Sequence, residues 1–308
     1  MANSNPGQKL AEVLACRIPL ERLLCGEPMK CHTTFQIGGP ADLLVMPATP
    51  EEASFVFSEA EKSSVPITVI GNGSNLLVRD KGIRGLVVKF GPAMAEIQHA
   101  GTTVTAGGGA LLSDVAQYAA AQNLTGMEFA VGIPGSIGGA VYMNAGAYDG
   151  EMSRIVTKVT AVCPEGTIGM YSRADLQFSY RHSVFQANRC VICQVELELA
   201  VGDPVAIESL MADLTCKRND KQPLEFPSAG STFKRPSGFF AGTLIEQAGC
   251  KGLTVGGAQV SEKHAGFLIN TGGATATDVL QLIRQVQSIV KARFDVDLVP
   301  EVIVLGEE

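Results

Sequence analysis

Two glycine-rich segments constrain this chain more than any other feature of its sequence. The sequence holds 34 glycines among 308 residues, and many of them gather at 71–76 (GNGSNL) and at 132–147 (GIPGSIGGAVYMNAGA). Glycine has no side chain, so it is favoured where the main chain turns sharply or where another group approaches it closely. Both segments are therefore expected to be loops whose backbone is in close contact with something else.

The second segment lies within an uncharged stretch, 129–148, that is long enough to suggest a membrane span. Its glycines and Pro134 would open the helix backbone in lipid. We therefore expect loops and tight turns here, and no membrane insertion. Near the start of the chain, charges at Lys9, Glu12 and Arg17 interrupt the apolar residues and leave no apolar core of a secretory signal. The expected location is the cytoplasm.

Charge and composition exclude several other classes of protein. The formal net charge is −7, and no more than two Lys or Arg residues are adjacent anywhere in the chain. A nucleic-acid surface requires clustered cations, so no nucleic-acid partner is expected. Hydrophobic residues make up 46% and charged residues 18%, which is typical of a folded globular protein and not of a disordered one.

Standard enzyme motifs are absent from the sequence. GxxxxGK[ST] does not occur, and segment 71–76 begins like GxGxxG but lacks the third glycine. The four histidines show no metal-binding spacing, and Cys190 and Cys193 have no second pair that would complete a zinc site. We therefore expect no metal, and we expect the eight cysteines to be buried thiols.

Apolar patterning predicts strands and helices without strict alternation, which indicates an α+β fold. Breaks at 201–204 and near 91–92 are candidate domain boundaries. The helix beginning at Pro50 is expected to have Thr49 as its N-cap and Glu52 as the partner in a capping box. Strands are expected at 41–46, 67–70, 85–90, 103–106, 157–162, 191–199 and 302–305, and helices at 50–62, 113–121, 204–214 and 278–293.

The glycine-rich segments also suggest a kind of ligand. Segment 71–76 directly follows the expected strand 67–70, so its main-chain N–H groups are able to face an anion such as a diphosphate. Taken alone, this segment is more simply explained as a tight surface turn. Together with 132–147, it predicts a dinucleotide held mainly by the main chain, outside a Rossmann fold.

Further segments extend the pattern. They are His32–Ala41 (HTTFQIGGPA), Tyr180–Phe185 (YRHSVF), Pro227–Pro236 (PSAGSTFKRP) and Leu298–Val302 (LVPEV). Together with the two glycine-rich segments, and in this order, they resemble the UDP-N-acetylenolpyruvoylglucosamine reductase family. The similarity is to the shorter members, because the link from Phe185 to Val191 leaves no room for the tyrosine-bearing insertion of the longer ones.

The resemblance implies a two-subdomain FAD-binding fold of the p-cresol methylhydroxylase type and a C-terminal α+β substrate-binding domain. Applied to this sequence, the first FAD-binding subdomain spans 1–90, the second 91–203 and the substrate-binding domain 204–296, while 297–308 returns to the first. FAD is expected to be bound without a covalent link. Its expected contacts are Gly71, Asn72, Gly73, Ser74, Asn75, Leu76, Gly132, Ile133, Pro134, Gly135, Ser136, Gly138, Gly139, Asn144, Gly146 and Ala147.

The activity implied by the resemblance is the NADPH-dependent reduction of UDP-N-acetylglucosamine enolpyruvate to UDP-N-acetylmuramate, in bacterial peptidoglycan precursor synthesis. Hydride passes from NADPH to FAD and then from flavin N5 to the β-carbon of the enolpyruvyl group. The α-carbon takes its proton from a serine, which is Ser231 in this sequence. Arg181 and Glu301 match the other catalytic positions. The residues that match substrate-binding positions are Tyr180, Lys221, Arg235 and His264.

The chemistry requires groups of these types. Hydride addition to an enolpyruvyl ether moves negative charge onto the substrate carboxylate, which an arginine can bind through two parallel hydrogen bonds. Serine is a weak acid, so the proton transfer from Ser231 needs assistance from a neighbour. Glu301, at the start of an apolar strand, is expected to be shielded from water and to donate a hydrogen bond.

Two other functions are compatible with these residues. An oxidase of an alcohol or sugar with the same FAD fold often tethers its flavin through His or Cys, and only His32 and Cys31 lie in suitable segments. A non-catalytic binder of a flavin or a nucleotide sugar would hold its ligand without turnover. No obligate protein partner is expected.

Overall fold

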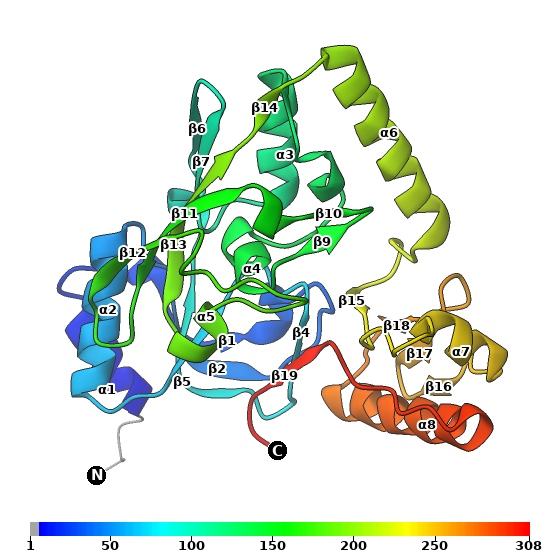
Figure 1. The fold of residues 1–308 in the computed structure, drawn as a ribbon. Helices are drawn as coiled ribbons and strands as arrows, with labels where there is room; N and C mark the ends of the chain where they lie inside the picture. The colour runs from blue at the N-terminus through cyan, green and yellow to red at the C-terminus, as the bar shows by residue number, and fades with distance from the viewer. Residues whose placement is uncertain (1–5) are drawn as a thin grey trace, which may run out of the picture. The chain divides into compact units, whose positions relative to one another are not determined.

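The computed structural model describes residues 6–308, which Figure 1 shows as a ribbon. Residues 1–5 of the first expected subdomain therefore lie outside the described residues. The chain divides into two compact units. The first unit comprises Met1–Gly26, Asp42–Asn72 and Gly85–Lys217, and the second comprises Glu27–Ala41, Gly73–Arg84 and Arg218–Glu308. The division expected from the sequence, with boundaries after 90, 203 and 296, stays a prediction.

The first unit is built on two larger sheets. One has the strand order β1-β2-β5-β3, and most of its residues belong to this unit. The other is an antiparallel sheet with the order β12-β11-β13-β7-β6. The strands are β1 (Leu23–Pro28), β2 (Pro40–Val45), β3 (Ile67–Ile70), β5 (Ile83–Lys89), β6 (Ile97–Ala100), β7 (Thr103–Gly107), β11 (Val156–Val162), β12 (Ile168–Ser172) and β13 (Val191–Glu198), and the short pairs are β8 (Leu124–Thr125) with β14 (Ala200–Val201) and β9 (Gly146–Ala147) with β10 (Gly150–Glu151).

Helices cover these sheets and complete two hydrophobic cores. The neighbouring helices α1 and α2 (Figure 1) pack Leu10, Leu14 and Phe57 against Leu86 and other apolar residues. The second core joins α3 and α4 to β7, β11 and β13. The helices are α1 (Pro6–Leu14), α2 (Pro50–Lys62), α3 (Leu112–Ala121), α4 (Ile137–Tyr142), α5 (Phe185–Asn188) and α6 (Pro204–Lys221).

The second unit combines an antiparallel sheet with two helices. The sheet has the order β15-β18-β17-β16, and α8 and α7 pack their apolar faces into its core. The parallel pair β4–β19 joins Leu76–Val78 to Ile303–Leu305. The elements are β4 (Leu76–Val78), β15 (Ser228–Ser231), α7 (Ala241–Gln247), β16 (Thr254–Val255), β17 (Ala258–Val260), β18 (Phe267–Asn270), α8 (Ala276–Phe294) and β19 (Ile303–Leu305).

These elements confirm the predicted strands and helices within a few residues, and the mixed architecture confirms the α+β class. One helix is longer than predicted. The apolar residues of α6 that are buried are Ile207 and Leu214, and the helix continues to Lys221 as a polar segment with an ion pair of 2.6 Å between Lys217 and Asp213. Among residues 6–308, no helix is long and apolar enough to cross a membrane.

The expectation of loops alone at 132–147 was wrong, because Ile137–Tyr142 forms helix α4. Its N-cap is Ser136, whose hydroxyl accepts the N–H of Gly139 at 3.3 Å. The N–H of Gly138 donates to the carbonyl of Gly108 at 3.0 Å. The helix thus forms despite its glycines because its cap and its contacts with another segment compensate for their low helix propensity.

The expectation of eight buried thiols was also wrong. Cys163 and Cys190 form a disulfide, while Cys16, Cys25, Cys31 and Cys216 are free and exposed. The reason for the pairing is the register of β11 and β13, in which Val162 opposes Val191, so that the cysteines just outside these strands face each other. Cys193 and Cys250 are the buried thiols, and burial raises the pKa of Cys193 to about 12.

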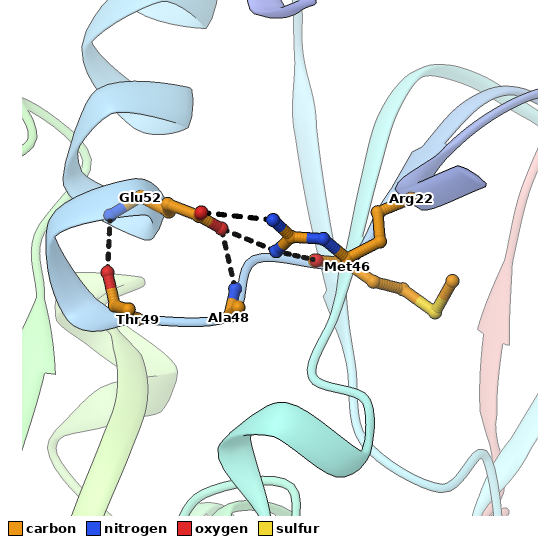
Figure 2. A network of polar contacts seen from close by, with 5 residues as sticks. All are labelled: Arg22, Met46, Ala48, Thr49 and Glu52. Atoms are coloured by element: carbon orange, nitrogen blue, oxygen red, sulfur yellow. Dashed lines mark hydrogen bonds and ion pairs between the residues drawn. The ribbon is translucent and has the colours of Figure 1, made fainter. Parts of the chain in front are cut away.

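The start of α2 combines a confirmed prediction with a corrected one (Figure 2). The hydroxyl of Thr49 accepts the N–H of Glu52 at 3.1 Å, as an N-cap should. The carboxylate of Glu52 does not complete a capping box. It accepts the N–H of Ala48 at 2.8 Å and binds both terminal nitrogens of Arg22, at 2.5 and 3.0 Å. Arg22 also donates to the carbonyl of Met46 at 3.2 Å. The Arg22–Glu52 ion pair therefore connects the start of α2 to the residue before β1, and Arg22 also contacts the residue after β2.

We predict that Glu52→Gln lowers the free energy of unfolding by about 1–2 kcal/mol at pH 7, since a paired, partly buried charge is lost. The hydrogen bonds from Arg22 hold the pKa of the Glu52 carboxyl below its ordinary value. Its contribution is therefore full above the ordinary glutamate pKa and disappears as the pH falls through the lowered one. Urea unfolding at pH 7 and at successively more acidic pH measures the difference, which should shrink with acidification. A difference that is constant over this range would contradict the assignment.

Candidate functional site

In the first unit, the two glycine-rich segments meet at Asn72 and Pro134. The side-chain amide of Asn72 donates to the carbonyl of Pro134 at 2.7 Å. A Cβ atom at Gly71 would lie only 2.5 Å from the Ser136 hydroxyl. The structure therefore brings the start of segment 71–76 against segment 132–147, as expected for two parts of one site.

The residues here fit a ligand held mainly by the main chain. Residues 132–135 keep part of their surface accessible, and neither 71–76 nor 132–147 carries a charged side chain. Positive charge for a diphosphate would come from main-chain N–H groups, as in an anion-binding nest. The predicted FAD contacts in this segment are thus compatible with the geometry, and they stay predictions.

Asn144 links the glycine-rich segment to the predicted catalytic arginine. Its side chain is buried, with 3% of the residue exposed. The amide nitrogen donates to the carbonyl of Ser179 at 3.1 Å, and the amide oxygen accepts the N–H of Ser153 at 2.9 Å. In this structure the Asn144 side chain is hydrogen-bonded to the main chain of Ser179 and Ser153. The predicted contact of Asn144 with FAD stays a prediction.

Arg181 lies in a tight turn. The N–H of Ser179 donates to the carbonyl of His182 at 3.2 Å, and the N–H of His182 donates back at 3.1 Å, so Tyr180 and Arg181 are the two central residues. Arg181 has a φ of 55°, a left-handed conformation that is unusual for a residue with a side chain. Its guanidinium carbon is 5.2 Å from the centre of the Tyr180 ring, which is 62% exposed. The predicted catalytic and substrate-binding residues of this turn thus lie side by side.

The rest of segment 71–76 belongs to the second unit. Gly73 has a φ of +67°, and a side chain there would collide with the carbonyl of His32. Its own carbonyl accepts the N–H of Thr34 at 3.3 Å. Asn75 donates from its side chain to the carbonyl of Glu301 at 3.3 Å and accepts the N–H of Ile303 at its carbonyl at 2.9 Å.

Ser231 and Glu301 are brought together by main-chain pairing. Ser231 ends β15, and the next residue, Thr232, accepts the N–H of Glu301 at 2.8 Å. Phe233 and Pro300 extend this contact as an isolated β-bridge. Ser231 is exposed, and Glu301 is only partly buried, so the expectation that Glu301 is shielded from water does not hold for this structure. Arg181, the third predicted catalytic residue, belongs to the first unit.

The predicted substrate-binding residues Lys221, Arg235 and His264 belong to the second unit. The guanidinium of Arg235 is stacked over Phe240, 4.0 Å from the ring centre. His264 accepts the N–H of Gly266 at 3.1 Å and packs edge-on against Phe267. Burial lowers the pKa of His264, which favours the neutral ring that this hydrogen bond requires. Lys221 is the last residue of α6.

Sequence reasoning gave no role to Thr34 or Asn270, although both fasten the segment around Phe35. Thr34 donates its hydroxyl to the carbonyl of Ser228 at 2.7 Å, and the Asn270 amide donates to the carbonyl of Phe35 at 3.2 Å. The signal for Thr34 was its place in the segment His32–Ala41. His32, the candidate flavin tether of an oxidase, has its Nε2 atom 2.9 Å from Glu27 Oε1.

Comparison with known proteins identifies the family. Residues 41–169 match the FAD binding domain, and residues 222–305 match the UDP-N-acetylenolpyruvoylglucosamine reductase C-terminal domain. The reductase of that name from Caldanaerobacter subterraneus is 47% identical over 287 residues, which cover 93% of this chain and 95% of that protein. The chain belongs to the UDP-N-acetylenolpyruvoylglucosamine reductase family. This confirms the resemblance, the oxidoreductase class and the FAD-binding domain expected from the sequence.

Other comparisons agree. The Clostridium botulinum UDP-N-acetylenolpyruvoylglucosamine reductase is 49% identical over 286 residues, or 93% of each chain. The crystal structure of the reductase from Thermus caldophilus superposes with a TM-score of 0.80 at 36% identity, covering 91% of this chain and 97% of that one. p-Cresol methylhydroxylase matches with a TM-score of 0.50 at 13% identity over 65% of this chain. This last likeness shows a shared fold alone, so the oxidase alternative has only the fold in its favour.

We predict that Gly71→Ala weakens FAD binding by about 5- to 150-fold, because the added methyl group displaces Ser136 or opens the contact with segment 132–147, at a cost of about 1–3 kcal/mol. The affinity of the apoprotein for FAD is measured by quenching of flavin fluorescence. Gly91→Ala is the matched control, since a Cβ atom there would meet only the Met46 sulfur, at 3.6 Å. Equal FAD affinities in the two variants would contradict this view of Gly71.

Proposed function

We propose that this chain reduces the enolpyruvyl ether of UDP-N-acetylglucosamine to the lactyl ether, with NADPH as the reductant and FAD as the bound cofactor. The observation that carries the proposal is the hydrogen bond of 2.8 Å from the main-chain N–H of Glu301 to the carbonyl of Thr232. This bond holds Glu301 next to the residue that follows Ser231. The chain is also 47% identical to a curated reductase over 93% of its length. The predicted cytoplasmic location is part of the same proposal.

Bound FAD supplies the chemistry of hydride transfer, between NADPH and the β-carbon of the enolpyruvyl group. The residues proposed to hold FAD are those of segments 71–76 and 132–147, acting mainly through their main chain. The partly accessible glycines Gly71, Gly132 and Gly135 and the lack of charged side chains support this role.

Arg181 is proposed to bind the substrate carboxylate. Negative charge develops there as hydride adds to the β-carbon, and a fixed guanidinium stabilises it more as the charge grows. The stacked Tyr180 ring limits the directions that the guanidinium can take. Tyr180, Lys221, Arg235 and His264 are proposed to bind the remainder of the nucleotide sugar.

Ser231 is proposed to protonate the α-carbon. Its Oγ–H bond breaks as the new C–H bond forms, and the serine regains a proton from solvent or a neighbour, so that one hydride and one proton are added in total. Glu301 is proposed to assist at the same carbon by donating or relaying a proton. The exposed position of Ser231 gives the hydroxyl access to a ligand.

The proposal is tested first by the visible spectrum of the purified protein under anaerobic conditions. NADPH should bleach the flavin band, and the enolpyruvyl sugar should restore it. Bleaching without recovery would refute the proposed substrate. Rapid recovery with oxygen alone would favour the oxidase alternative.

We predict that Ser231→Ala leaves flavin reduction by NADPH unchanged and slows reoxidation by the enolpyruvyl sugar by about 10²–10⁴-fold, since a general acid contributes on this scale. Stopped-flow absorbance separates the two half-reactions. Ser237→Ala, a change at an exposed serine of the same unit, serves as the control. Slow reduction by NADPH in Ser231→Ala would count against the role of Ser231.

For Glu301→Gln, we expect the same half-reaction to slow while substrate affinity changes less than threefold or so, because the amide keeps the size of the side chain and loses its exchangeable acid proton. Titration of the oxidised protein with the enolpyruvyl sugar, followed by the flavin spectrum, gives the affinity. If affinity falls as much as the rate does, Glu301 acts in binding and not in proton transfer.

A further inference from the structure

The turn that carries Arg181 is held by a side chain that the proposed mechanism does not use. Gln186, from the short helix α5, donates from its amide nitrogen to the carbonyl of Arg181 at 2.9 Å and to the carbonyl of Tyr142 at 3.2 Å. The amide group has two N–H bonds, which suffice for these two carbonyls, and the same nitrogen lies 3.8 Å from the weak acceptor Met143 Sδ. One side chain thus connects the Arg181 peptide group to the end of α4.

The acceptor on α4 is a carbonyl that the helix itself leaves without a partner. The last carbonyls of a helix lack intrahelical donors. The N–H groups of the following residues satisfy Gly139, Ala140 and Val141. The carbonyl of Tyr142 accepts instead from Gln186 and from the Ser183 hydroxyl, the latter at 2.8 Å.

Arg181 needs such support because of its backbone conformation. A φ of 55° is unfavourable for a residue with a Cβ atom and persists only where the surroundings fix it. The hydrogen bonds between Ser179 and His182 close the turn, but they do not engage the carbonyl of Arg181. The Gln186 amide engages that carbonyl and so sets the plane of the peptide group that follows Arg181.

We propose that Gln186 is a positioning residue that holds Arg181 in the orientation required to bind the substrate carboxylate. This inference rests on the proposed function, in which Arg181 stabilises charge on the enolpyruvyl group. Gln186 itself contacts neither substrate nor cofactor in this proposal. It acts through the Arg181 main chain, and a small displacement of a charged group from its working position is enough to slow a reaction strongly.

Gln186→Met keeps the length of the side chain and removes the hydrogen bonds donated to the carbonyls of Arg181 and Tyr142. We expect it to slow flavin reoxidation by the enolpyruvyl sugar about tenfold or more, with reduction by NADPH and FAD affinity unchanged. Gln177→Met, the same substitution at an exposed position of the same segment, should leave both half-reactions unchanged. Gln186→Lys restores a donor and should recover most of the rate. If both half-reactions and FAD affinity fall together, or if Gln186→Lys is as slow as Gln186→Met, the positioning role is overturned.

A double-mutant cycle tests whether Gln186 acts through Arg181. In an Arg181→Ala background, Gln186→Met should have no further effect on reoxidation, because the group that it positions is gone. Full additivity of the two losses would overturn the inference while leaving the role of Arg181 intact. An Arg181→Ala variant with the normal reoxidation rate would instead overturn the proposed role of Arg181, and this inference with it.

Discussion

Close contact between main chains, at positions where a side chain has no room, determines the arrangement of the first unit. Helix α4 approaches β7 and β13 so closely that a Cβ atom at Gly138 would lie 2.9 Å from the carbonyl of Gly108. That carbonyl accepts the N–H of Gly138, so a buried polar group of the helix is satisfied by the same approach. The location of α4 is therefore fixed by its backbone. Gln186, which is hydrogen-bonded to the last residue of α4, is held in place by the same contact.

In both units, hydrogen bonds to main-chain carbonyls position the segments that carry the side chains proposed to react. In the first unit, the side chains of Asn144 and Gln186 donate hydrogen bonds to the carbonyls of Ser179 and Arg181, which lie on either side of Tyr180. In the second unit, pairing between Thr232 and Glu301 sets the spacing of two segments far apart in the sequence. Sites supported in this way keep their geometry better than sites on unsupported loops.

Local signals predicted the elements of this fold well, and contacts between distant residues account for the failures. Thr49 and Pro50 correctly predicted the start of α2. The binding of Glu52 by Arg22 was not predicted, because Arg22 lies far from the helix in the sequence. Helix α4 was missed because its glycines disfavour a helix, and its stabilising partner is Gly108. The residues of the candidate site came from similarity of whole segments. The contacts that fix them, such as those of Asn144, depend on tertiary structure and are not encoded in any single motif.

The pairing of β4 with β19 has a consequence for how the protein is made. Residues 303–305 are synthesised long after residues 76–78, the segment with which they pair. Until then, β4 lacks the parallel neighbour of its native state and presents open hydrogen-bonding groups, the kind of edge that pairs with other chains. Domains that fold during synthesis usually complete their N-terminal parts first. Here β4 lacks its partner until residues 303–305 are made, so a nascent chain that has not reached residue 303 exposes this edge of β4.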